Sequence, residues 1–553
     1  MRTTKILMIS AAALAIGACG GEKSAGGETK ASAAALKTSA GSPLDQSFSF
    51  SGGEQMDLDA VLTLLPDDAR PTYENASFDE SIGATVVENL RFSDADDGEA
   101  ILIERAELYG VDQSAIERIT NAENSGPDAQ FETVFQKIRL LNVKAEGFDK
   151  EEINFEIGGV EFDKLAVRQG GGENPDGAEA ANFFNAFTLA GLYFKDISMD
   201  AEDDEFGGAV DFSAPDLRFV GLEGGKISAI IAKDFGYSTT QGEGARQVLR
   251  DAMGPQGGPL VDGPLGMMLA PESQRAEVEA LEWRNIDLSG LMDFGLKGDE
   301  PPVSARNLMD LGTMKATGMT SYVNDRPLFI AEEVSLSAAE FAWLIPSKIR
   351  MDTKNATYDF TAYVADENAP AYDVLKAQGL DNVKGAGFAE WTWNPDRGGA
   401  RLQYNAESEG LADFSMAFDL GGMKLSDIGE AIENDVDNPI AQTASFKSMS
   451  FKIDDEKALD AIFALSALQM GGTGEDLRQS APALLRLSGA QFVQGIPRAQ
   501  GYLSAFADFI AEGGSLEISA NPEEPLDLQA VQASAVAPQA LPDVLNLTVT
   551  HSE

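Results

Sequence analysis

Cysteine and histidine are almost absent from this chain of 553 residues, which contains one of each. Because Cys19 stands alone, no disulfide can form within the chain. Zinc sites built from cysteine and histidine are excluded too, since Cys19 and His551 cannot supply a ligand set between them. His551 lies two residues from the C-terminus. A Ser/His/Asp or Cys/His nucleophilic system would depend on that frayed position, and we do not expect one.

Basic residues are also few, with 41 Lys and Arg against 90 Asp and Glu and a formal charge of −49. Nucleic-acid binding is disfavoured, because it depends on neutralising phosphates with basic side chains. Adhesion of a basic patch to anionic lipid headgroups is disfavoured for the same reason. Such acidity mainly indicates solubility or a salt-adapted host.

Motifs of nucleotide binding and serine catalysis are missing as well. The chain contains no GxSxG and no GxxxxGK[ST], and Gly242-Glu243-Gly244 lacks the third glycine of a dinucleotide fingerprint. We therefore expect no cofactor and no resident metal. Carboxylates are the one abundant catalytic type and could in principle hydrolyse a glycan as a pair. With 90 of them, no pair and no catalytic residue can be nominated.

The start of the chain has the pattern of an export signal. Arg2 and Lys5 precede an apolar run of 11 residues from Ile6 to Ile16, and small residues follow. A charged n-region, an apolar h-region and a small-residue cleavage site define such a signal. The run is too short for a membrane-spanning helix, which needs roughly 20 residues.

The segment Ile16-Gly17-Ala18-Cys19 resembles the lipobox of bacterial lipoproteins. The resemblance implies that residues 1–18 are a signal peptide and that Cys19 carries the lipid anchoring the protein to a membrane. Gly20 follows the cysteine, where lipoproteins retained in the inner membrane commonly have an aspartate. The resemblance therefore favours the outer membrane, with the protein facing the periplasm.

Residues 19–44 are predicted to form a flexible tether. Small and polar residues such as Gly, Ser, Ala, Lys, Glu and Thr make up almost all of this stretch. It cannot bury enough apolar surface to order itself.

Alternation of apolar and polar residues with a period of two dominates the rest of the chain and predicts half-buried strands. The clearest run continues from Ile153 through Phe155, Ile157, Val160 and Phe162 to Val167. Turn residues separate such runs at Gly158-Gly159, Gly224-Gly225 and Pro395–Gly399. We predict a β-rich α+β fold: antiparallel, hairpin-rich curved sheets in two lobes, with helices between strand groups and towards the C-terminus.

Residues 254–264 concentrate proline and glycine and mark the clearest boundary. We predict a linker or crossover over residues 254–270. An N-terminal β-rich lobe would then span residues 45–253, and a C-terminal β-rich lobe with helical segments would span residues 271–553.

Apolar residues at helical spacing predict helices at Ala178–Leu189, Ala245–Met253 and Glu456–Met470, the last with Asp454 or Asp455 as N-cap. Another is expected to begin at Pro497 and end at Gly513-Gly514. Strands are expected to follow at Ser515–Ser519 and Val544–Val549.

A calcium-like stretch, Asp94–Gly98, precedes Glu104. Aligned to an EF-hand loop, it puts Ala95 where a ligand is required. Its flanks are strand-like, so we predict a hairpin turn.

A short sequence pattern occurs three times, at residues 193–199, 282–288 and 445–451. It consists of an aromatic residue, a basic residue and a polar residue, followed by two apolar residues, one on either side of a polar one. It indicates either a repeated sheet module or chance similarity between alternating strands.

The succession of alternating strands along the chain loosely resembles that of AsmA-like envelope proteins, which are β-rich and associated with lipid handling. Those proteins normally begin with a transmembrane helix, which we do not find here. The leading hypothesis is a non-enzymatic cell-envelope lipoprotein whose amphipathic β-sheet binds lipid or a protein partner. Trp343, Trp391 and Trp393 could line such a face, although core packing is the expected role of each. The alternatives are a carboxylate-dependent glycan hydrolase and a purely structural or assembly lipoprotein.

Overall fold

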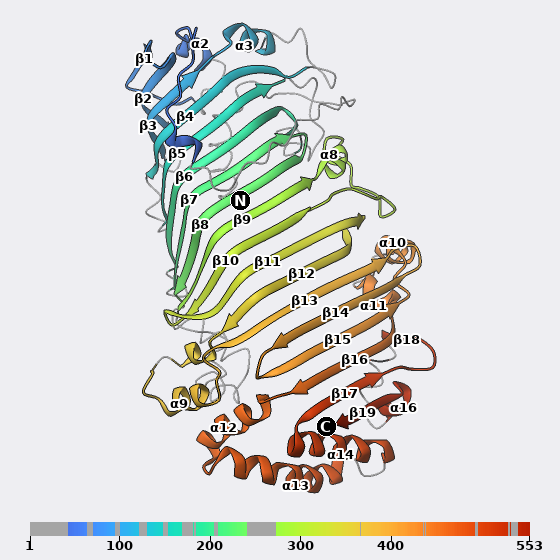
Figure 1. Cartoon of the computed structure of the whole chain (residues 1–553). Coiled ribbons are helices and arrows are strands. Elements are labelled where there is room, and N and C mark those ends of the chain that lie inside the picture. The colour runs from blue at the N-terminus through green and yellow to red at the C-terminus, as the bar shows by residue number, and fades with distance from the viewer. Residues whose placement is uncertain are drawn as a thin grey trace. The chain divides into compact units, whose positions relative to one another are not determined.

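The computed structural model describes residues 42–62, 70–93, 100–120, 130–146, 153–168, 181, 184–203, 208–240, 273–364, 366–434, 436, 438–492, 496–528, 531 and 540–553. The predicted signal peptide, Cys19 and the linker at 254–270 lie outside these residues, as do the tether up to residue 41 and the helix predicted at Ala245–Met253. Strands dominate the described part (Figure 1).

The fold is β-rich and antiparallel as predicted, but the expectation of separate sheets in two lobes is not met. The nineteen strands of the described residues belong to a single sheet. Antiparallel hairpins can extend a sheet strand by strand, because each new strand pairs the open edge of the last. The described chain divides into two compact units: the first has the residues up to 240 with 275–301 and 308–314, and the second has 273–274, 302–307 and the residues from 315 on.

In the first unit consecutive strands are neighbours in the sheet, and the ladders that join the first eight of them are antiparallel. The strands are β1 (Asn75–Asp79), β2 (Ala84–Ser93), β3 (Ala100–Tyr109), β4 (Glu132–Glu146), β5 (Ile153–Val167), β6 (Phe187–Asp203), β7 (Gly208–Glu223), β8 (Lys226–Thr240) and β9 (Ser273–Asp287). Its helices are η1 (Pro43–Asp45), α2 (Leu58–Leu62), α3 (Gln113–Thr120) and α8 (Ser289–Gly295). Val61 of α2 and Ile116 of α3 pack with Val87, Ile138 and Val160 in the core.

The turn predicted at Gly158-Gly159 is wrong, because both glycines lie inside β5. The ladders pair Leu141 with Gly159 and Val143 with Ile157, which sets Gly158 opposite Asn142 of β4. On its other side Gly158 lies opposite Asp196 of β6. Asn142 and Asp196 have left-handed backbones, with φ of 54° and 52°.

Asn142, Gly158 and Asp196 thus form an irregular row across three neighbouring strands. At this row the alternation of side chains shifts, as it does at a bulge. The core-facing residues of β5 are therefore spaced by two and then by three positions, as in Phe155, Ile157, Val160 and Phe162. A single long strand keeps one apolar face across the shift.

Charged side chains are buried on β4 and β5 of the first unit. Glu161 is fully buried and bonds both Lys137 and Arg139, whose Nε lies 2.7 Å from the Glu161 carboxylate. Residues 42–50 lie over them: the Phe48 ring is 4.8 Å from Lys137 Nζ, and the Pro43 carbonyl accepts a bond from Arg139 at 3.3 Å. The last residues of the predicted tether, 42–44, and the residues that follow them are thus held against this part of the sheet.

The second unit holds most of β10 (Thr313–Val323) and the strands that follow it. These are β11 (Arg326–Ala342), β12 (Ile345–Tyr358), β13 (Val383–Asn394), β14 (Gly399–Ser408), β15 (Ala412–Gly421), β16 (Ser445–Asp455), β17 (Gly514–Ala520), β18 (Leu526–Asp527) and β19 (Leu547–Ser552). Its helices are η4 (Phe360–Tyr363), α9 (Pro370–Ala377), α10 (Leu425–Glu433), α11 (Pro439–Thr443), α12 (Ala458–Met470), α13 (Gly474–Phe492), α14 (Pro497–Glu512) and α16 (Leu541–Val544). From β11 to β16 each strand pairs with the next.

Two helix predictions in the second unit are confirmed. Helix α12 covers nearly all of the predicted range. Its N-cap is Lys457 and not Asp454 or Asp455, although the Asp455 carboxylate accepts a bond from the Leu459 amide at 3.0 Å. Helix α14 begins at Pro497 and ends before Gly513, whose φ is 77°. Helix α13 was not predicted.

Other local predictions are corrected in part. The helix predicted to reach Leu189 ends earlier, because β6 begins at Phe187. The strand predicted from Val544 begins at Leu547, since residues 541–544 form α16. The turn at Gly224-Gly225 is confirmed between β7 and β8. The strands β2 and β3 pair around residues 94–99, which lie outside the described part.

Candidate functional site

The register of the second unit gives the sheet one apolar face. The central row across β11–β16 joins Leu336, Met351, Ala389, Tyr404, Met416 and Phe451, each directly opposite the next. A row on one side joins Ala338, Ile349, Trp391, Leu402, Phe418 and Met449, and a row on the other joins Val334, Thr353, Gly387, Ala406, Phe414 and Ile453. We call these three rows the apolar face.

The opposite face of the same strands is polar. One of its rows runs through Lys348, Thr392, Arg401, Asp419 and Ser448. Since side chains alternate between the two faces of a strand, the period of two in the sequence produces this separation.

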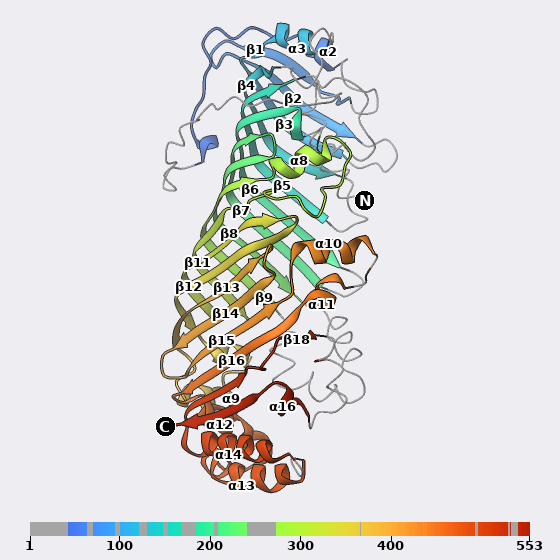
Figure 2. The same cartoon turned by 90° about the vertical axis from the view of Figure 1, so that its right-hand side faces the viewer.

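Among the described helices, some cover the two ends of the apolar side, and none covers its middle. At one end Leu425 and Ile428 of α10 pack on Trp393 and Ala400. At the other end Leu375 of α9 and Ala461 of α12 pack with Leu380 and Val383. Figures 1 and 2 show α10 and the pair α9 and α12 at opposite ends of these strands.

Between these ends no side chain of the apolar face, all of which are described, is buried. Leu336 is 36% exposed, Met351 41% and Tyr404 38%, and the others are half-buried. A contiguous apolar surface of this kind normally marks a binding site.

A hollow of about 310 Å³ lies on this surface between β12 and β14. Its lining includes Met351, Tyr358, Phe360 and Tyr404, with Gly387 and Ala406 among them. Small residues flanked by large ones create the depression. Burial raises the pKa of Tyr358, so its hydroxyl stays neutral.

Aromatic rings continue the surface beside the hollow. Tyr404 meets Phe414 edge to face with 6.3 Å between ring centroids, and Phe414 meets Phe451 in the same way at 4.7 Å. Aromatic side chains present large, rigid apolar areas.

The carboxyl groups whose pKa values are shifted do not resemble the catalytic pair of a glycosidase, in which one carboxylic acid needs a raised pKa. Among the described Asp and Glu residues, every resolved shift lowers the pKa. The largest is at Glu333, where hydrogen bonds from Lys315 and Lys354 lower the pKa to about 2. The described residues also contain no group of His, Cys, Asp and Glu suited to a metal ion, and no helix among them is long and apolar enough to cross a membrane.

The residues singled out from the sequence fall in different places. Cys19 lies outside the described residues. Core packing is confirmed for Trp393, which is 5% exposed and donates its Nε1 hydrogen to the Met423 carbonyl at 2.8 Å. Trp391 lies on the apolar face, half-buried, and Trp343 is partly buried against the core cluster that contains Trp393.

Sequence reasoning did not single out Met351, Tyr404 or Phe414, although their alternation is visible. Alternation shows that a strand has an apolar side, but not whether that side is covered.

Comparison with known proteins adds one match. A family model described as "Uncharacterized protein" matches residues 405–552, from β14 to β19. No curated protein matches the chain.

Proposed function

We propose that this protein is a non-enzymatic lipoprotein of the cell envelope that binds lipid acyl chains on the apolar face of its second unit. The uncovered middle of that face carries the proposal. The lipid on Cys19 would hold the protein at a membrane, which we propose to be the outer membrane, with the chain in the periplasm.

The chemistry of the face favours acyl chains over a protein partner. Its three rows contain few polar groups: the hydroxyls of Thr353 and Tyr404, and the Trp391 Nε1 hydrogen, which is donated to the Pro346 carbonyl at 3.2 Å. Protein interfaces typically carry about one hydrogen bond per 100–200 Å². An acyl chain has no hydrogen-bond donor or acceptor and therefore needs no polar partner.

The energy available is sufficient for binding. Each buried methylene contributes about 0.8 kcal/mol, so ten of them would contribute on the order of 8 kcal/mol before the entropic cost of ordering the chain. The hollow is at the small end of ligand sites, which span roughly 300–1,000 Å³, so the surface around it would cover the rest of a long chain.

Native mass spectrometry with lipid extraction tests this on the chain that begins at Gly20, expressed in a bacterial periplasm. We expect acyl lipid to co-purify with the wild type and to be lost from Tyr404→Glu, which sets a charge in the middle of the face. Asn405→Glu is the matched control, because it places the same charge at the next residue on the opposite face. Because these side chains are partly exposed, both variants should fold.

A wild-type protein free of lipid would contradict the proposal. So would equal lipid occupancy in the two variants.

A further inference from the structure

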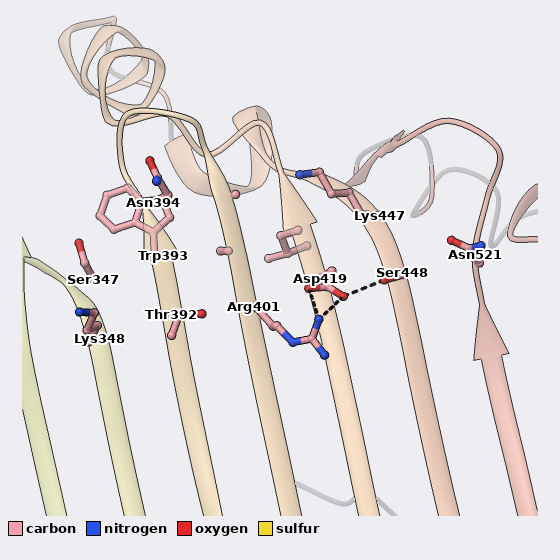
Figure 3. A pocket seen from close by; sticks show the side chains of 13 residues that line it. Ser347, Lys348, Thr392, Trp393, Asn394, Arg401, Asp419, Lys447, Ser448 and Asn521 are labelled. Atoms are coloured by element: carbon pink, nitrogen blue, oxygen red, sulfur yellow. Dashed lines mark hydrogen bonds and ion pairs between the residues drawn. The ribbon is translucent and has the colours of Figure 1, made fainter.

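A second hollow lies on the polar face of the second unit, near the ends of β12–β16 (Figure 3). Its volume is about 470 Å³. Three cationic side chains line it, Lys348, Arg401 and Lys447, against the single carboxylate of Asp419. In a chain with a net charge of −49, this is an unusual local excess of positive charge.

Lys447 enters the hollow because of a bulge. Asp419 pairs with Ser448 and Leu420 with Phe446, so Lys447 is the extra residue between them. Bulges re-aim a side chain in this way.

The Lys447 side chain lies over glycine. A Cβ atom built on Gly421 would be 2.5 Å from Lys447 Cε, and one on Gly399 would be 3.9 Å from Lys447 Nζ. Gly399 and Gly421 thus leave the room that this side chain occupies. Lys447 has no hydrogen-bond or ion-pair partner for its ammonium group among the described residues, so its charge is available to a ligand.

Arg401 is held in place but keeps free donors. Its Nη1 lies 3.3 Å from both oxygens of Asp419, and Ser448 Oγ donates to the same carboxylate at 2.9 Å. This leaves the Nε and Nη2 hydrogens of Arg401 without a partner within the described residues. A guanidinium fork of this kind matches the geometry of a phosphate.

Polar groups complete the lining. Thr392 and Asn521 add a hydroxyl and an amide to the lining, whereas the Ser448 hydroxyl already donates to Asp419. Lys348 also pairs with Glu340, so it adds less charge than Lys447.

From this arrangement we infer that the hollow binds a phosphate-type oxyanion, either free phosphate or the phosphomonoester group of a larger ligand. The site lies on the face opposite the acyl surface, since Arg401 and Asp419 belong to the polar row. It therefore does not depend on the proposed function, and either can fail alone.

Titration calorimetry with inorganic phosphate at constant ionic strength tests the inference on the chain beginning at Gly20. We expect saturable binding to the wild type and a Kd raised about tenfold in Lys447→Ala, because one charge-assisted hydrogen bond is lost. The control is Lys452→Ala, on the same strand and the same face, where Lys452 pairs with Asp454 at 2.7 Å. Its Kd should not change.

The Asp419→Asn variant should bind phosphate more tightly, a result that misfolding cannot produce. It removes the one carboxylate of the hollow, and we expect phosphate to bind at least about threefold more tightly. Glycerol phosphate in place of inorganic phosphate separates the two sources: tighter binding assigns the site to a phosphorylated headgroup, and equal binding assigns it to the bare oxyanion. No saturable phosphate binding at millimolar concentration, or equal losses in Lys447→Ala and Lys452→Ala, would overturn the inference.

Discussion

Replacing Glu161 with glutamine tests the buried charges of the first unit. Glu161 is fully buried between Lys137 and Arg139, whose side chains are each 10% exposed. The neutral amide would leave both cations buried without their shared partner, which typically costs 3–5 kcal/mol. We expect about 3 kcal/mol, the lower end, because Asp163 lies 3.7 Å from Lys137 Nζ and still offsets part of its charge.

Glu156→Gln is the matched control on the same strand. Glu156 pairs with Lys144 at 2.9 Å, but their side chains are 59% and 51% exposed. Surface pairs of this kind are worth about 0–1 kcal/mol. Hydrogen exchange of peptides from β4–β6 measures the free energy of opening of the first unit by itself. Equal losses in the two variants would refute the reasoning, because they would mean that Glu161 is as hydrated as Glu156.

Two further predictions concern pH and the anchor. The pKa of Glu333 is lowered from 4.5 to about 2 by hydrogen bonds from Lys315 and Lys354, so its contribution to stability is present above about pH 4.5 and is lost as the pH falls towards 2. The wild type should therefore exceed Glu333→Gln in Tm at pH 7 and match it near pH 2, and a pH-independent difference would contradict this. Cys19→Ala should remove the lipid from the N-terminal peptide, seen by mass spectrometry, and move the protein from the membrane to the soluble fraction. Unchanged membrane association would count against a Cys19 anchor.

Local signals predicted the elements whose ends depend on neighbouring residues. Asp455 lies beside the start of α12, Pro497 begins α14, and Gly513 follows its end. Helix α13 has a start signal that the sequence analysis did not use, since the Thr473 hydroxyl accepts a bond from the Asp476 amide at 3.1 Å. Its interior is less helix-like, because Pro482 lies inside it and exposed Leu484 and Leu487 break an amphipathic pattern.

The glycines of β5 show where local reading fails. A glycine pair between apolar runs is a turn signal, yet Gly158 and Gly159 lie within one strand. Their irregular row depends on Asn142 and Asp196, which the fold brings alongside from other strands.

The amino-acid sequence by itself determined the strand content, the antiparallel hairpins and the amphipathic character of the strands, because these follow from residues a few positions apart. Only the tertiary structure decided that the strands share one sheet and that helices leave the middle of the apolar face open. It also decided that Lys447 lines the same hollow as Arg401 and Asp419. Register and covering depend on contacts between residues far apart in the chain, and alternation with a period of two fits many pairings equally well.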